Sequence, residues 1–273
     1  MKKMTKICLI LSAVLFLIGT VALFAGISMG ARLEEFLQVN LGGGQINLNG
    51  YPRIRIGTYS PDIDEAADKE TIPAGQLEEL NLRIGAGEVG IYLSPAAEEI
   101  ICYSNRSHSL LSVKGDTLTI KDDILNPSLK LELYLPEKIW KEIDLELGAC
   151  SAYIERMEAQ DVSIELGAGT VSVDSLSYLD SADLQVGAGK LSVNTCEGKE
   201  LQLECGMGSL QITLAGKKAD YNYRLECGAG TIFLQDEEFY GIGPKNRVDN
   251  QAAKQVKAEC GIGEIIIALE ENN

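Results

Sequence analysis

The chain repeats one short pattern, in which an alternating apolar strand is followed by Gly-X-Gly or a close copy and then by a second alternating strand. Seven segments carry it: LNLRIGAGEVGIYL, IDLELGACSAYI, VSIELGAGTVSV, ADLQVGAGKLSV, LQLECGMGSLQI, YRLECGAGTIFL and VKAECGIGEIII. Through the middle of the series, the first glycines of successive copies lie about twenty residues apart, a period typical of stacked supersecondary units. The pattern therefore constrains the fold far more than it constrains any chemistry.

Each copy predicts two strands that are joined by a sharp corner. Val162, Ile164 and Leu166 alternate with polar residues, which indicates that one face of this strand is buried. The following pair, Val171 and Val173, has the opposite parity, so the chain must turn if both strands are to face one interior. Glycine permits such a turn because it adopts conformations that are closed to other residues. We expect corners at Gly85, Gly87, Gly148, Gly167, Gly169, Gly187, Gly189, Gly206, Gly208, Gly228, Gly230, Gly261 and Gly263.

The repeats predict an all-β fold, namely a single-stranded parallel β-helix or β-solenoid with about twenty residues per coil over residues 77–273. One coil cannot bury its own apolar face, whereas consecutive coils that stack build a continuous core and pair their backbones. The runs between residues 86 and 147 are interpreted as degenerate coils, and residues 235–255 are expected to project as a loop. Residues 32–76 are interpreted as a juxtamembrane segment and an acidic, proline-containing linker.

The segment from Ile7 to Ala31 carries no charge and is long enough to cross a bilayer as a helix. Lysines precede it and glutamates follow it, so the positive-inside rule predicts a short cytoplasmic tail at residues 1–6 and repeats on the outer side of the cell membrane. A cleaved signal peptide is the alternative, although its apolar region is usually shorter, about 7–15 residues. A stripe of small residues along this helix favours a helix-mediated dimer: Ala22, Gly26 and Gly30.

The balance of charge excludes one class of partner. The chain has 40 acidic and 24 basic residues, which gives a formal net charge of −16. A surface of this charge repels phosphate backbones and anionic lipid headgroups, so we exclude nucleic-acid binding. The acidic exterior either serves solubility alone or attracts cations and basic partners.

Glutamates recur two positions before most first glycines, where the alternation points them outward. We call this set the acidic strip: Glu146, Glu165, Glu204, Glu226 and Glu259. Like charges opposite one another on paired strands are destabilising, so a stacked row of glutamates requires an explanation. Either water, salt and the neighbouring Arg224 and Lys257 screen the row, or the row binds divalent cations or a basic ligand.

Three cysteines, Cys205, Cys227 and Cys260, directly precede a first glycine, at an inward position where other copies have isoleucine, leucine or valine. We expect buried thiols that act as small apolar side chains. A disulfide between stacked neighbours is the alternative, since adjacent strands lie within bridging reach. A zinc site is less favoured, because a straight row of thiols does not converge on one ion.

The residues predict no catalytic, cofactor or metal site. The only histidine, His108, lies in a polar loop among serines. GAGEVG, with Gly85, Gly87 and Gly90, matches the dinucleotide fingerprint, but that fingerprint requires a following helix and a strand follows here. Some parallel β-helix proteins are polysaccharide lyases, which need an acidic cluster beside a basic residue. A carbohydrate-active β-helix enzyme that acts on acidic or wall polysaccharides is therefore the alternative function.

The stretches GDTLTIKDD from Gly115 and LKLELYLPEKIW from Leu129 to Trp140 precede the run of Gly-Ala-Gly coils. In this order of parts, residues 77–269 resemble the bacterial putative-adhesin family of β-strand repeat proteins. The resemblance implies a β-helical or β-roll fold displayed outside a bacterial membrane, and it brings no catalytic residues. We predict a non-catalytic, membrane-anchored surface protein for adhesion, envelope scaffolding or stress sensing, with an extracellular protein or a polysaccharide as its partner and no cofactor.

Overall fold

The computed structural model describes residues 68–94, 98–106, 108–123, 128–240 and 246–270, all within one compact unit. Apart from one short 3₁₀ turn, η1 (Lys218–Asp220), the secondary structure of these residues is β, which confirms the predicted class. The strands are β1 (Asp68–Pro73), β2 (Glu79–Leu93), β3 (Glu99–Ser104), β4 (Leu111–Lys114), β5 (Thr117–Asp122), β6 (Lys130–Leu135), β7 (Trp140–Val186), β8 (Lys190–Glu197), β9 (Glu200–Cys205), β10 (Ser209–Ala215), β11 (Tyr221–Cys227), β12 (Thr231–Leu234), β13 (Glu237–Tyr240), β14 (Asn246–Val248), β15 (Lys254–Cys260) and β16 (Glu264–Glu270).

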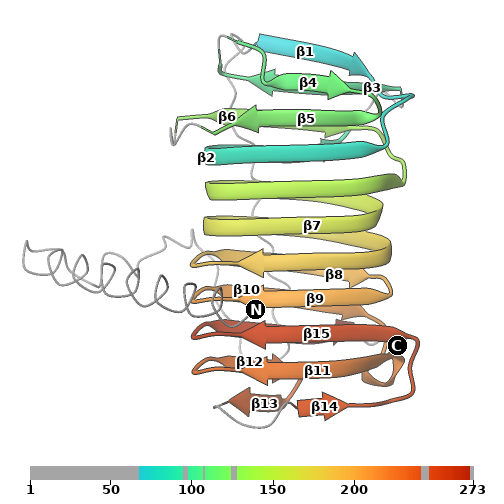
Figure 1. Cartoon of the computed structure of the whole chain (residues 1–273), viewed down its shortest axis with the longest axis vertical. Helices are drawn as coiled ribbons and strands as arrows, with labels where there is room; N and C mark the ends of the chain where they lie inside the picture. Colours follow the sequence, from blue (N-terminus) through green and yellow to red (C-terminus); the bar gives the residue numbers. More distant parts are fainter. Residues whose placement is uncertain (1–67, 95–97, 107, 124–127, 241–245, 271–273) are drawn as a thin grey trace, which may run out of the picture. The chain divides into compact units, whose positions relative to one another are not determined.

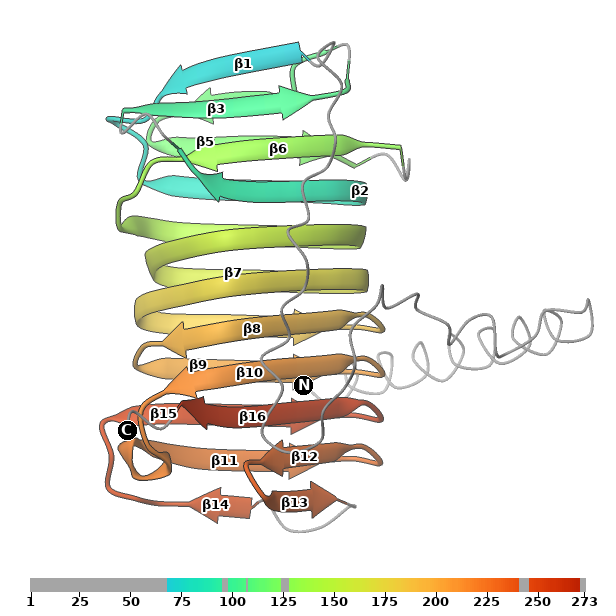
Figure 2. The same ribbon diagram turned by 180° about the vertical axis from the view of Figure 1, so that it is seen from behind.

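The strands on either side of the glycine corners form two faces of parallel strands (Figures 1 and 2). Face A contains β5, the first part of β2, successive parts of β7, and then β9, β15 and β11. Face B contains β6, the second part of β2, the other parts of β7, and then β8, β10, β16 and β12. The coils pair in register, so that Leu82 of β2 lies opposite Leu145 of β7. The described unit is thus a solenoid-like stack.

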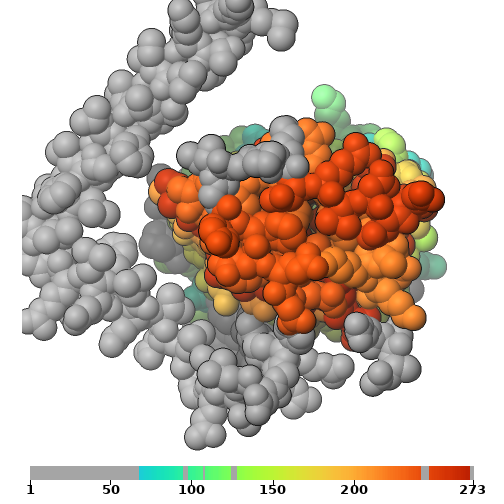
Figure 3. All heavy atoms as spheres, turned by 90° about the horizontal axis from the view of Figure 1, so that it is seen from below, coloured from blue at the N-terminus to red at the C-terminus, as the bar shows by residue number. Residues whose placement is uncertain are grey.

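Antiparallel strands cover both ends of the parallel stack. At one end β4 pairs with β5, while β1 pairs with β3 and β3 with β6. At the other end β13 pairs with β12 and β14 with β11, and Figure 3 shows side chains of this region packed over the end. Strand β1 falls within the expected linker 32–76, and β13 and β14 fall within 235–255. The expectation that 235–255 only projects as a loop is therefore wrong, because this segment supplies strands that pair with the exposed edge of the last coil.

The last coil in the sequence is not the last coil in the stack. Strand β15 pairs with β9 on one side and with β11 on the other, and β16 lies between β10 and β12 in the same way (Figures 1 and 2). The expectation that each coil stacks on the preceding one is therefore wrong at this end. The chain first builds the β11–β12 coil and its cap, and then returns to fill the position between that coil and the β9–β10 coil.

A continuous apolar core runs between the two faces. Nearly all inward positions of the coils are occupied by leucine, isoleucine, valine, alanine or cysteine, and most of them are fully buried. Larger side chains are buried as well, those of Trp140, Tyr178, Tyr221 and Tyr223. Burial of apolar surface on this scale, at roughly 25 cal/mol per Å², is the main favourable contribution to stability.

The backbone ladder continues around the glycine corners. The Gly187 N–H donates to the Leu166 carbonyl at 2.8 Å, and the Ala188 N–H donates to the Gly167 carbonyl at 2.8 Å. A Cβ atom built on Gly167 would lie 2.8 Å from the carbonyl oxygen of Gly148 in the adjacent coil, closer than real Cβ atoms approach such an atom. Close approach of stacked backbones, rather than an unusual φ, therefore requires glycine at this first position.

The expected membrane segment at residues 7–31 and the tail at residues 1–6 lie outside the described residues. Within the part of the chain that the structure describes, no helix is long and apolar enough to cross a membrane.

Gly169 combines both reasons for a glycine, because its φ is +101° and a Cβ atom there would overlap the Cys150 carbonyl. We expect Gly169→Ala to lower the free energy of unfolding by at least roughly 1–3 kcal/mol, the usual cost of a strained backbone conformation. Gly75→Ala is the control, since nothing lies within 4 Å of a Cβ at Gly75, and it should change stability by less than about 0.5 kcal/mol. Equal denaturation midpoints for the two variants would contradict the corner geometry.

Candidate functional site

The outward side chains of face A form rows that cross the stacked strands. The register places Gln185 opposite Glu204, Glu204 opposite Glu259, and Glu259 opposite Glu226. The predicted alignment of these members of the acidic strip is therefore observed, although in the order that the inserted coil imposes. At the other end of the strip, Arg83 of β2 lies opposite Glu146.

Basic side chains neutralise part of the acidic strip. Lys257 contacts Glu259 with an N–O distance of 2.6 Å, and Arg224 contacts Glu226 at 3.0 Å. The hydrogen bond to Glu259 raises the pKa of Lys257, and an ion pair with Glu146 raises the pKa of Arg83. Of the two readings of the strip, these contacts favour screening by neighbouring side chains.

A shallow groove of about 560 Å³ runs between the acidic strip and the corner glycines. Among the described residues, no group of three or more histidine, cysteine, aspartate or glutamate side chains is arranged to hold a metal ion. The glutamates stand side by side along the row, one from each strand, so they do not converge on one point.

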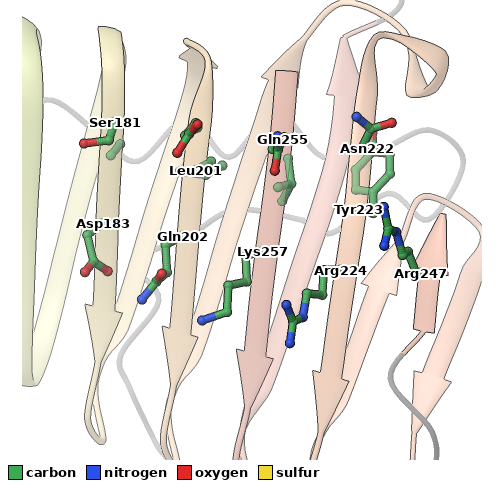
Figure 4. Close-up of a pocket in the computed structure, with 13 residues that line it drawn as sticks. Ser181, Asp183, Leu201, Gln202, Asn222, Tyr223, Arg224, Arg247, Gln255 and Lys257 are labelled. Carbon is green, nitrogen blue, oxygen red and sulfur yellow. The ribbon is translucent and has the colours of Figure 1, made fainter. Parts of the chain in front are cut away.

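A second, larger groove of about 710 Å³ lies beside the strip on the same face, across strands β7, β9, β15, β11 and β14. Figure 4 shows side chains from these strands at successive levels along it. One level carries Ser181, Glu200, Gln255 and Asn222, and the next carries Asp183, Gln202, Lys257 and Arg224. The groove therefore carries side chains of both signs of charge, and its lining also includes apolar residues such as Leu201 and Val256.

Three cations occupy neighbouring positions along this groove, and we call them the cation row: Lys257, Arg224 and Arg247. Lys257 of β15 lies opposite Arg224 of β11, which lies opposite Arg247 of β14. Stacked like charges repel, and each cation is accompanied by a carboxylate two residues further along its own strand or in the adjoining turn. The sequence pointed to Lys257 and Arg224 but not to Arg247, since Arg247 joins the row only through the antiparallel pairing of β14.

The thiols before the corner glycines point inward, as predicted. Cys205 and Cys260 are each 3% exposed, whereas Cys227, in the last coil of the stack, is half-buried. All three are free thiols. Cys260 and Cys205 are register partners, and the hydrogen bond between the two thiols lowers the pKa of Cys205 and raises the pKa of Cys260.

The remaining candidates from the sequence have no catalytic arrangement in the described residues. His108 is exposed. The fingerprint-like glycines Gly85, Gly87 and Gly90 lie within the continuous strand β2, so the helix that a dinucleotide site requires does not follow them. Cys150, which replaces a second corner glycine, is buried and packs against the Ile84 carbonyl, with an S–O distance of 3.5 Å.

The double substitution Glu226→Gln and Glu259→Gln leaves the stacked cations without their carboxylates. We expect it to lower the free energy of unfolding at low salt by up to about 1 kcal/mol, and the loss should shrink as salt screens the cations. Glu165→Gln is the control, because it removes one charge from the strip between Glu146 and Gln185 and should leave stability unchanged or slightly higher. Stabilisation by the double substitution would mean that repulsion within the strip dominates.

Thiol reactivity provides a second test. In the folded protein, Cys227 should react with a thiol reagent faster than Cys205 and Cys260, since only Cys227 is partly exposed. All three should react at similar rates once denaturant unfolds the chain. Peptide mapping by mass spectrometry after short labelling measures this order, and rapid native labelling of Cys260 would contradict the inward assignment.

Comparison with known proteins gives a family match. Residues 70–243 match the family described as Toastrack DUF4097, and no curated protein matches the chain. Among solved structures, the chain is similar to a putative cell adhesion protein from Clostridium sporogenes, with 16% identity, a TM-score of 0.42, and coverage of 75% of this chain and 100% of that one.

Two further solved structures show weaker similarity. One is a putative adhesin from Bacteroides fragilis, with 12% identity, a TM-score of 0.31, and coverage of 75% of this chain and 98% of that one. The other, from Parabacteroides merdae, has 12% identity, a TM-score of 0.34, and coverage of 76% and 92%. The family match spans more than half of the sequence and includes the two stretches from Gly115 and Leu129 that pointed to bacterial β-strand repeat proteins. The chain belongs to the Toastrack DUF4097 family.

Proposed function

We propose that this protein is a non-catalytic surface protein, anchored in the bacterial membrane by residues 7–31, which binds a partner through face A. The observation that carries the proposal is the groove of about 710 Å³, which crosses five strands of that face. A long open groove with both signs of charge fits an extended, charged partner.

The scaffold supports binding because the backbone beneath the groove is preorganised. Strands β9, β15 and β11 are each paired with a strand on both sides, and β14 is paired with β11. The backbone therefore needs no rearrangement when a partner binds, so the entropic cost of association is limited to ordering the side chains.

The contacts within the groove support a binding role over catalysis. Lys257 and Glu259 form an ion pair, Arg224 and Glu226 form another, and the Gln202 amide donates to Glu204 at 2.6 Å. These groups are held in pairs along each strand, whereas an acid–base site needs groups that converge on one substrate atom.

The charges around residues 7–31 support display of the repeats outside the cell, with an extracellular protein or a polysaccharide as the partner. Adhesion, envelope scaffolding and stress sensing all use such an arrangement.

A photo-crosslinking residue in place of Gln255, within the groove, should capture the partner in living cells that express the full chain. The same residue at Gln160, which is exposed but does not line the groove, is the matched control and should capture much less. Gel shifts after irradiation, with identification of the captured material, measure the difference.

Equal capture at the two positions would contradict binding through face A. Protease added to wall-stripped cells tests the orientation, since it should digest the repeats and leave a membrane-bound stub. Full protection of the repeats would contradict display outside the cell, and turnover of a captured polysaccharide would contradict the non-catalytic role.

A further inference from the structure

We infer that the groove of face A binds a carboxylate-bearing polysaccharide through the cation row Lys257, Arg224 and Arg247. This inference rests on the proposed function and adds the chemistry of the partner. It starts from a contrast of charge, because three cations lie side by side in a chain whose formal net charge is −16. Two carboxylates, Asp183 and Glu200, line the same groove on β7 and β9, so the cations gather at its other end.

The cation row has a spacing that the fold sets. The three side chains stand on neighbouring strands, β15, β11 and β14, and adjacent strands lie about 4.8 Å apart. They point to the same side of the sheet (Figure 4), and their side chains are 37%, 53% and 75% exposed, in the order Lys257, Arg224, Arg247. The row therefore presents a short, regular series of cations to a ligand that runs across the strands.

Two of the three carboxylates that accompany these cations are exchangeable. Glu259 and Asp249 are 42% and 55% exposed, and exposed ion pairs of this kind contribute little to stability, whereas Glu226 beside Arg224 is only 25% exposed. Arginine binds carboxylates through a planar fork of N–H groups, so a ligand carboxylate can replace a protein carboxylate with the same geometry. The present ion pairs thus show which anion the row accepts.

The groups beside the cation row favour a hydroxyl-rich ligand. Gln255 lines the same groove and presents an amide that can hydrogen-bond to sugar hydroxyl groups, whereas the Gln202 amide already donates to Glu204 and the Ser181 hydroxyl to Asp161.

Two other classes of macromolecule fit less well. A peptide often binds by adding a strand to an open sheet edge, but at this end the edges of β11 and β12 are paired with β14 and β13, so the open edges belong to strands of only three and four residues. A nucleic acid and a uronic-acid polysaccharide are both polyanions, and the acidic body of the protein disfavours each of them. The polysaccharide offers carboxylates, the anion that already pairs with these cations, together with hydroxyl groups.

The test measures binding of polygalacturonate to the full-length protein in detergent, with neutral dextran as the blank. The triple variant Arg224→Gln, Arg247→Gln and Lys257→Gln should bind at least about tenfold more weakly than the wild type, and rising salt should weaken wild-type binding. The matched control replaces two arginines and one lysine that also form surface ion pairs, through Arg83→Gln, Arg156→Gln and Lys141→Gln. It should retain binding within about twofold. Thermal melts establish that both variants are folded.

Equal weakening by both triple variants would assign the effect to net charge and overturn the cation row as a site. Poly-L-glutamate that binds as tightly as polygalacturonate would overturn the assignment to polysaccharide. Absence of binding to polygalacturonate overturns this inference but leaves the proposed function standing if crosslinking at Gln255 still captures a partner. Conversely, capture that is equal at Gln255 and Gln160 defeats the proposed function whatever the polymer does.

Discussion

The close approach of stacked backbones at the glycine corners is the constraint on which the rest of this structure depends. A Cβ at Gly167, Gly187 or Gly206 would lie less than 3 Å from a carbonyl oxygen of the coil beneath. Without side chains at these positions, the hydrogen-bond ladder of face A passes around the bend into face B. Register on one face is thereby tied to register on the other, and this is what aligns the outward charges into rows.

The glycine corners also explain which residue types occupy the inward position directly before each corner. A Cβ at Gly208 would lie 2.7 Å from the Val186 side chain, and a Cβ at Gly263 would lie 2.8 Å from the Cys205 sulfur. The inward side chain that precedes one corner therefore fills the space beside the second glycine of the adjacent coil, where a Cβ atom would otherwise lie. A small or slender apolar side chain suits this position, so valine and cysteine are structurally interchangeable there. The cysteines need no redox role to explain their placement.

Much of this architecture was predictable from the repeat, because corners, inward thiols and the outward glutamates all follow from alternation and period. Local patterns carry no information on which strands become neighbours, however. The inserted position of β15 and β16 and the pairing of β14 follow from long-range contacts. Arg247 was consequently not predicted as a groove residue. The spacing between the first glycines Gly228 and Gly261 exceeds the usual period of about twenty residues, and this did indicate an irregular coil. Strand β1 was likewise not predicted, because its partner β3 is distant in sequence.

The insertion of the β15–β16 coil between two earlier coils determines when this part of the protein can fold. The coils within β7 contact their neighbours in sequence, so they can assemble progressively as the chain emerges, as local contacts form quickly. Strand β15 lies between β9 and β11, so each of these two strands lacks a hydrogen-bonded partner on one side until residues 254–260 have been synthesised. At a synthesis rate of about 5–20 residues per second, the first half of the stack has seconds in which to form before the last coil exists. The groove of face A, which needs β15, is thus completed last, and it stays incomplete in a chain that stops short of this coil.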